Sequence, residues 1–224
     1  EGRAGTGLNT WRVYATFSNP AVDVLSVYGT AANPIDISSS TNWYQDPLGA
    51  ATGNGINPLL FTDFPSLAYD SWVTVGAESS ADGEISVVGL DLNAFEAGED
   101  LTSDGTAGGS WIAIPGEVNG TSPDAQGRVL IAQLTTDGTI VFDCNLQYWE
   151  SDGSSPVATE VSRVLQNGCR EDINGSGMVE IDDILAVLTQ FGCTGNCSGD
   201  LDGDGDVDVT DGLQVLGAFA NVCN

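Results

Sequence analysis

The chain contains no histidine and no lysine, and it has a single methionine among its 224 residues. The missing histidines exclude a Ser-His-Asp triad, a Cys-His pair and histidine metal ligands, and the missing lysines exclude Schiff-base catalysis. A pair of carboxylates, as in glycosidases, is the one common catalytic design that remains. With 32 acidic residues a chance pair carries little meaning, so we expect no enzyme activity and keep a small glycosidase only as the second alternative. The candidates for such a pair are Glu84, Glu96, Glu99 and Glu117, and nothing beyond their residue type singles them out.

Positive charge is almost absent as well. Five arginines are the only basic residues, and the net charge is −27. A chain this acidic repels nucleic acids and anionic membranes, and we expect neither as a partner. No apolar run reaches the length of about 18 residues that a membrane-spanning helix needs, so we also expect no membrane insertion.

The last part of the chain repeats a twelve-residue acidic pattern, first at 172–183 and then at 200–211. In both copies oxygen-bearing residues occupy positions 1, 3, 5, 9 and 12, a glycine (Gly177, Gly205) occupies position 6, and a valine occupies position 8. Calcium prefers six to eight oxygen ligands, and a loop of this length wraps around the ion if a glycine allows the sharp turn. We therefore predict two Ca²⁺ sites. Their metal ligands are Asp172, Asn174, Ser176, the Met178 carbonyl, Glu180 and Asp183 in loop 1, and Asp200, Asp202, Asp204, the Asp206 carbonyl, Asp208 and Asp211 in loop 2.

An apolar stretch with helical spacing follows each loop. With these features, residues 169–224 resemble a type I dockerin, a duplicated loop–helix unit of secreted bacterial proteins. Aspartate at position 12 and the lack of an entering helix favour this family over an ordinary EF-hand pair. The resemblance implies calcium binding and, in cellulosomes, docking to a cohesin-type partner. Positions 10 and 11 are Ile181-Asp182 in one repeat and Val209-Thr210 in the other, whereas cellulosomal dockerins often have Ser-Thr there. The resemblance therefore supports calcium binding more strongly than cohesin binding.

The five cysteines are typical of an oxidising compartment. If the two loop–helix repeats are related by a pseudo-twofold axis, the end of each helix lies near the start of the other loop. This arrangement favours the disulfides Cys193–Cys197 and Cys169–Cys223. Cys144 is left over, and we expect a buried, unpaired thiol there.

The first 150 residues consist of short apolar–polar alternations separated by Gly, Pro, Asn and Asp, which is typical of strands. About seven to nine strands predict a β-sandwich or jelly roll. The clearest hairpin joins 128–136 to 139–149 through Asp137-Gly138, a favoured two-residue turn, and it places Cys144 on the apolar face of the second strand. Further strands are predicted to begin at Trp11 and to lie at 22–28, 34–38, 71–76, 85–92 and 110–114.

These patterns predict a mainly β chain with a small helical calcium-binding module behind it. The β-sandwich domain is expected at 1–157, including a tail at 1–10 and a linker at 151–157, and the dockerin-like module at 158–224. Residues 158–166 are either a last strand or a short helix. The segments 44–49 and 69–76 are similar to an uncharacterised β module of secreted bacterial proteins, a similarity that implies no activity.

We therefore expect a non-catalytic, calcium-binding structural or assembly protein that associates with other protein subunits, as in an extracellular filament or matrix. Calcium loops of this kind need millimolar calcium, and the chain begins with Glu1 rather than Met, so we expect a removed leader and an extracellular or cell-surface location. The alternative is a carbohydrate-binding module attached through its dockerin to a cohesin-type scaffold. This alternative depends on the aromatic residues, because an exposed Trp or Tyr stacks on sugar rings. The pairs Trp43-Tyr44 and Tyr148-Trp149 each place one ring on either face of a strand, so one ring of each pair could be exposed.

Overall fold

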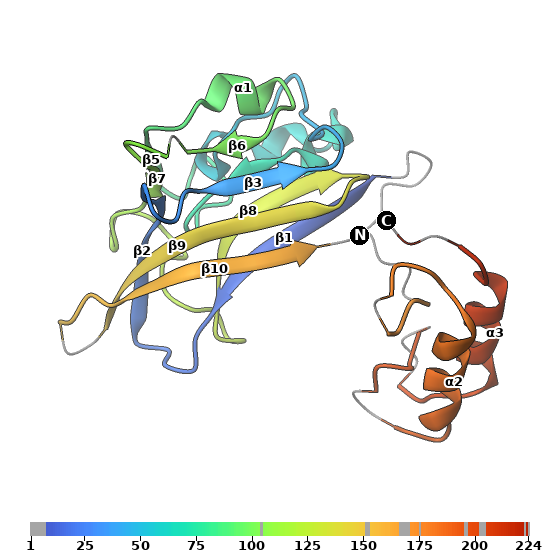
Figure 1. Cartoon of the computed structure of the whole chain (residues 1–224). Helices are drawn as coiled ribbons and strands as arrows, with labels where there is room; N and C mark the ends of the chain where they lie inside the picture. Colours follow the sequence, from blue (N-terminus) through green and yellow to red (C-terminus); the bar gives the residue numbers. More distant parts are fainter. Residues whose placement is uncertain are drawn as a thin grey trace. The chain divides into compact units, whose positions relative to one another are not determined.

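The computed structural model describes residues 8–224 except 104, 151–152, 166–170, 175, 195–196, 202–204, 222 and 224; for 159–160 and 164–165 it describes the backbone alone. The chain divides into two compact units, Glu1–Leu165 and Gln166–Asn224 (Figure 1). The N-terminal unit is mainly β, as predicted from its alternating sequence. None of the described helices is long and apolar enough to cross a membrane.

Two antiparallel sheets make up the N-terminal unit. The smaller sheet has the order β1-β8-β4, and the larger has the order β5-β7-β2-β9-β3-β6. β2 and β3 pair with successive parts of one edge of β9, and β10 lies along its other edge. The strands are β1 Asn9–Thr16, β2 Val22–Gly29, β3 Asp36–Ser39, β4 Trp72–Val73, β5 Ser86–Val88, β6 Leu101–Thr102, β7 Gly109–Ile112, β8 Arg128–Thr136, β9 Ile140–Glu150 and β10 Val157–Leu165.

One apolar core is shared by the two sheets. The alternation of β9 decides which of its residues enter this core: Ile140, Phe142 and Cys144 are buried on one face. Ala132 and Leu134 of β8 enter the same core from the smaller sheet. The prediction that Cys144 is buried and unpaired is confirmed.

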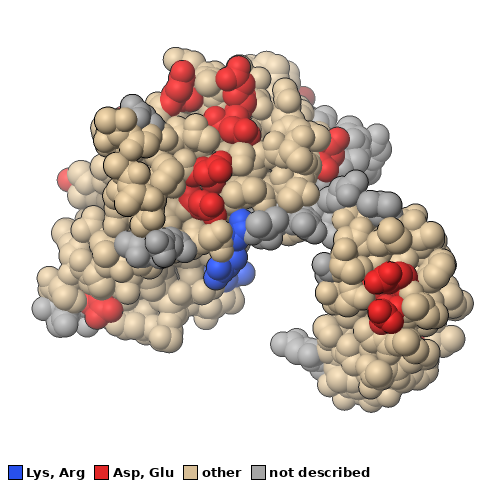
Figure 2. All heavy atoms as spheres, viewed as in Figure 1, with Lys and Arg blue, Asp and Glu red and all other residues tan. Residues whose placement is uncertain are grey.

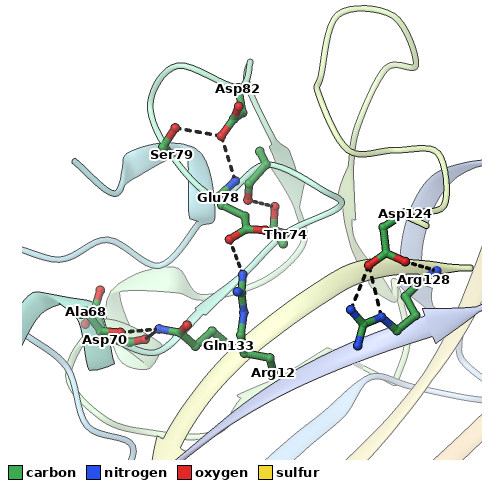
Figure 3. A network of polar contacts seen from close by, with 11 residues as sticks. Arg12, Ala68, Asp70, Thr74, Glu78, Ser79, Asp82, Asp124, Arg128 and Gln133 are labelled. Atoms are coloured by element: carbon green, nitrogen blue, oxygen red, sulfur yellow. Dashed lines mark hydrogen bonds and ion pairs between the residues drawn. The ribbon is translucent and has the colours of Figure 1, made fainter. Parts of the chain in front are cut away.

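Short helical segments connect the strands, at η1 Gly53–Gly55, η2 Pro58–Leu60, η3 Pro65–Tyr69 and α1 Leu92–Glu96. A polar network fastens this region to the smaller sheet (Figure 3). The Gln133 side chain of β8 donates hydrogen bonds to the carbonyls of Ala68 (3.1 Å) and Asp70 (2.9 Å), and Arg12 of β1 pairs with Glu78. The long connection between β3 and β5 is therefore held by side-chain hydrogen bonds in addition to β4.

The predicted hairpin between 128–136 and 139–149 is wrong in its pairing. Both strands form, but β8 and β9 lie in different sheets. β8 has β1 on one edge and β4 on the other, so it has no edge left for β9. Neither Asp137 nor Gly138 has the positive φ that a type I′ turn requires. The Asp-Gly pair instead marks the point where the chain passes from one sheet to the other.

The predicted linker at 151–157 and the predicted tail at 1–10 both overlap strands of the N-terminal unit. Residues 151–152 lie outside the described part, but Gly153 N–H donates to the carbonyl of Glu150 (2.9 Å), and Glu150 N–H to that of Ser154 (2.9 Å). Residues 153–156 lead into β10, so the alternative left open for 158–166 is resolved in favour of a strand up to Leu165. Backbone pairing of β10 with β9 places the boundary between the units after Leu165 rather than at 157.

At the other end of the chain, residues 1–7 of the predicted tail lie outside the described part, and Asn9 and Thr10 already belong to β1. They pair with Thr136 and Thr135 of β8. These two residues therefore pack against their own domain.

The C-terminal unit contains helices α2, Ile181–Thr189, and α3, Val209–Gly217, which both begin at loop position 10. Acidic residues favour this start because they lie at the positive end of the helix dipole. The carboxylates of Asp183 and Asp211, one in each first turn, also accept the N–H groups of Glu180 and Asp208 at the helix N-caps. The core of the unit is small and is made by Val179, Val187, Leu201, Val207, Val215 and Cys223.

Candidate calcium loops and the helical surface beside them

Loop 1 folds around its own acidic and amide side chains. The Asp172 carboxylate accepts the N–H groups of Ser176 (2.9 Å) and Gly177 (2.8 Å), and Gly177 has a φ of 86°. The Asn174 side-chain oxygen accepts the same Ser176 N–H at 2.7 Å. The Ser176 hydroxyl donates to the Met178 carbonyl at 3.0 Å. The glycine turn predicted at position 6 is confirmed, and positions 1, 3, 5 and 7 are linked by short hydrogen bonds.

Loop 2 repeats this geometry where it is described. Asp200 accepts the N–H of Gly205 at 3.1 Å, and Gly205 has a φ of 101°, as expected for the turn at position 6. Asp208 accepts the N–H of Thr210 at 2.6 Å and caps α3. The predicted ligands Asp202 and Asp204 lie outside the described residues. Asp206 is described, and its carbonyl remains a predicted ligand.

The position-12 aspartates are the most deeply buried acids of the C-terminal unit's described part, with exposed fractions of 0% for Asp183 and 1% for Asp211. Asp183 accepts N–H groups of Asn174 (3.0 Å) and Glu180 (2.9 Å), and Asp211 accepts those of Leu201 (2.7 Å) and Asp208 (2.8 Å). A buried carboxylate is costly unless it is hydrogen-bonded or paired with a cation. Each oxygen has two lone pairs, so these bonds leave room for a metal.

The donor set of both loops fits a hard cation. Every predicted side-chain ligand offers oxygen and none offers nitrogen or sulfur, which favours Ca²⁺ or Mg²⁺ over transition metals. Among the described residues no three acidic or cysteine side chains lie close enough to form a metal cage on their own. A bound Ca²⁺ would supply the positive charge that brings the acidic side chains of each loop together. The ligands named from the sequence remain a prediction.

The two repeats are interlocked through the valines at loop position 8. The Val207 N–H donates to the carbonyl of Cys193, just after α2, at 2.9 Å, and the Val207 carbonyl accepts the N–H of Gly192 at 2.8 Å. In the same way the Val179 N–H donates to the Asn221 carbonyl, just after α3, at 2.9 Å. Each loop is thus bonded to the segment that follows the helix of the other repeat, as expected for a pseudo-twofold arrangement.

The cysteines agree with this arrangement as far as they are described. The predicted Cys193–Cys197 disulfide is present. Cys223 is also disulfide-bonded. Its predicted partner Cys169 lies outside the described residues, so the Cys169–Cys223 pair stays a prediction.

The outer surface of α2 and α3 is apolar, which sequence reasoning did not anticipate. Eight large apolar side chains in or just after the two helices have exposed fractions between 49% and 61%. Each position in repeat 1 has its equivalent in repeat 2. We call this set the helical surface: Ile181, Leu185, Leu188 and Phe191 with Val209, Leu213, Leu216 and Phe219.

The sequence contained a signal for this surface. Each helix has more apolar residues than the one face that packs against the core can bury. The face shown in Figure 2 carries few charged atoms on the C-terminal unit, whereas acidic atoms are scattered over the N-terminal unit.

The glutamates considered for catalysis differ in their exposure to solvent. Glu84, Glu99 and Glu117 are exposed. Burial raises the pKa of Glu96. Among the described carboxyls with a shifted pKa, Asp70 is completely buried and has no exposed atom to offer a substrate. Burial raises its pKa to about 7, with a further contribution from the charge of Glu96.

No match to this chain is found among protein-family models, curated proteins or solved structures. The dockerin resemblance therefore depends on the loop residues themselves and on the spacing of the two repeats.

Proposed function

We propose that this protein is a non-catalytic, calcium-stabilised structural protein outside the cell, in which a β-sandwich is joined to a dockerin-like module and copies associate through the helical surface. One observation carries the proposal. The exposed apolar side chains occur at equivalent positions in both repeats. A helix face that contacts only water would not be stabilised by apolar side chains. A repeated apolar surface of this kind marks a protein-interaction site.

The size of the helical surface fits a stable contact. Each of its eight side chains is about half exposed. If roughly 100 Å² of each is covered, the set buries about 800 Å², which is one partner's share of a standard-size interface. A pseudo-twofold surface also suits a second copy of itself, because each row of side chains can lie against its equivalent.

Calcium is required because like-charged copies repel one another. The net charge is −27 per chain, and screening acts only beyond a Debye length of about 8 Å at physiological salt. Each bound ion cancels two negative charges in a loop that leads directly into the helical surface. Calcium therefore supports association in two ways, by ordering the helices and by lowering the repulsion between them.

Particle mass and shape with and without calcium test this function. We expect light scattering and negative-stain electron microscopy to show assemblies in millimolar calcium and single chains after chelation. The double variant L188S/L216S, which makes one equivalent position polar in each repeat, should remain monomeric while keeping its helix content. L59S is the matched control, because Leu59 is 85% exposed on the N-terminal unit. A wild-type chain that stays monomeric in calcium would rule out self-association, and assembly of the double variant would rule out the helical surface.

A further inference from the structure

One tryptophan stands apart from the other four. Trp43, Trp72 and Trp111 are buried in the N-terminal unit, and Trp11 is half-buried, but the side chain of Trp149 is 47% exposed. It lies near the end of β9, and its neighbour Tyr148 points to the other face of the strand, where its ring packs edge-on against Phe17 with centroids 5.1 Å apart. Tyr148 therefore anchors the strand, and the indole of Trp149 is left on the solvent side.

A carboxylate lies beside this indole. Asp23 of β2 is the direct cross-strand partner of Trp149, and paired residues of antiparallel strands project from the same face of the sheet. The Asp23 Oδ1 atom accepts hydrogen bonds from the hydroxyls of Ser122 (2.6 Å) and Thr121 (3.3 Å). Within the described residues no hydrogen bond involves Oδ2. The carboxylate is thus held in position by one oxygen and can accept a ligand's hydrogen bond with the other.

The two side chains border an open cavity of about 420 Å³, lined by Ala21, Asp23, Trp149, Glu150 and Gly153. A ligand site of this type combines an apolar platform with a few positioned polar groups. Here the platform is the indole ring, the acceptor is Asp23, and the indole N–H is a donor on the exposed side.

We propose that Trp149 and Asp23 form a binding site for a neutral, β-linked polysaccharide. A pyranose with equatorial substituents presents a flat face of C–H groups that stacks on the indole, and its hydroxyls donate to the Asp23 carboxylate in charge-assisted hydrogen bonds. The cavity is open rather than closed, so it accepts a unit within a long chain. Anionic polysaccharides are disfavoured by Asp23, by Glu150 and by the overall charge of −27. This site is independent of the helical surface and of calcium-dependent association.

Affinity electrophoresis of the full chain tests the proposal, because a strongly acidic protein migrates readily in a native gel. The probes are hydroxyethyl cellulose, mixed-linkage β-glucan and glucomannan, with alginate and chitosan as anionic and cationic comparisons. We expect at least one neutral probe to retard the wild type. Trp149→Ala should weaken the binding about tenfold or more, as truncation of a central aromatic does. Asp23→Asn should weaken it by a smaller factor, and Trp149→Phe should keep most of it.

Phe64→Ala is the matched control, since Phe64 is 46% exposed, and it should bind as the wild type does. Tryptophan fluorescence melting checks that each variant is folded. The proposal is overturned if no neutral probe retards the wild type, if only chitosan does, or if Trp149→Ala binds the retarding probe as tightly as the wild type.

Discussion

The Val207 amide donates a hydrogen bond to the Cys193 carbonyl at 2.9 Å, and so ties loop 2 to the end of the helix that follows loop 1. The equivalent bond in the other repeat joins Val179 to Asn221. Because each loop holds the other repeat's helix end, the two repeats cannot unfold separately without breaking these bonds.

Calcium should stabilise the C-terminal unit as a whole. An ion that binds only the folded loops adds about 2.7 kcal/mol at a hundredfold excess over its Kd. Asp211→Asn, which alters loop 2 alone, should therefore also lower the melting temperature of α2, as followed by far-UV circular dichroism. The control is Asp63→Asn, an exposed position in the N-terminal unit. Melting that is the same in calcium and in chelator would contradict the calcium sites.

Cys144 should resist modification in the folded protein. Burial, with the charge of Asp143, raises the pKa of its thiol to about 12, so almost no reactive thiolate is present at pH 8. Iodoacetamide should label Cys144 only after denaturation, and peptide mapping without reductant should show Cys193–Cys197 and Cys169–Cys223. Rapid labelling of Cys144 in the native state, or a disulfide that includes it, would be inconsistent with its place in the core.

The N-terminal unit should lose stability between about pH 5 and pH 8. The pKa of Asp70 is about 7 in the folded protein against 3.8 for the free side chain, so the folded state binds this proton more tightly. The resulting stabilisation is complete below pH 3.8 and is lost as the pH rises through 7. Asp82 and Asp124, whose pKa values are lowered, stay ionised throughout this window and do not contribute to the slope.

Tryptophan fluorescence reports this unit alone, since all five tryptophans belong to it. The wild-type melting temperature should fall from pH 5 to pH 8, whereas Asp70→Asn should keep only the smaller fall contributed by Glu96, whose pKa is also raised by burial. The exposed Asp63→Asn variant should keep the wild-type slope. An equally steep slope in Asp70→Asn would assign the pH dependence to another group.

Two glycines of the second repeat should respond in opposite ways to alanine. Gly212 lies inside α3 with a negative φ and open space where a Cβ would be, so Gly212→Ala should stabilise the C-terminal unit by about 0.5–1 kcal/mol. Gly205 has a φ of 101°, and Gly205→Ala should destabilise the unit by at least about 1 kcal/mol and weaken calcium binding. Urea unfolding followed at 222 nm measures both. A stabilised Gly205→Ala variant would exclude the tight turn at position 6.

The amino-acid sequence determined those features whose causes are local. Alternation placed Cys144 on the buried face of its strand, and glycine at position 6 gave the left-handed turn in both loops, because each depends on neighbouring residues only. The Cys193–Cys197 pair followed from the spacing of the repeats. Tertiary structure alone decided that β8 and β9 enter different sheets, since the edges of β8 are taken by the distant strands β1 and β4. It also decided that Trp149 is exposed beside Asp23, because that depends on the pairing of strands more than a hundred residues apart.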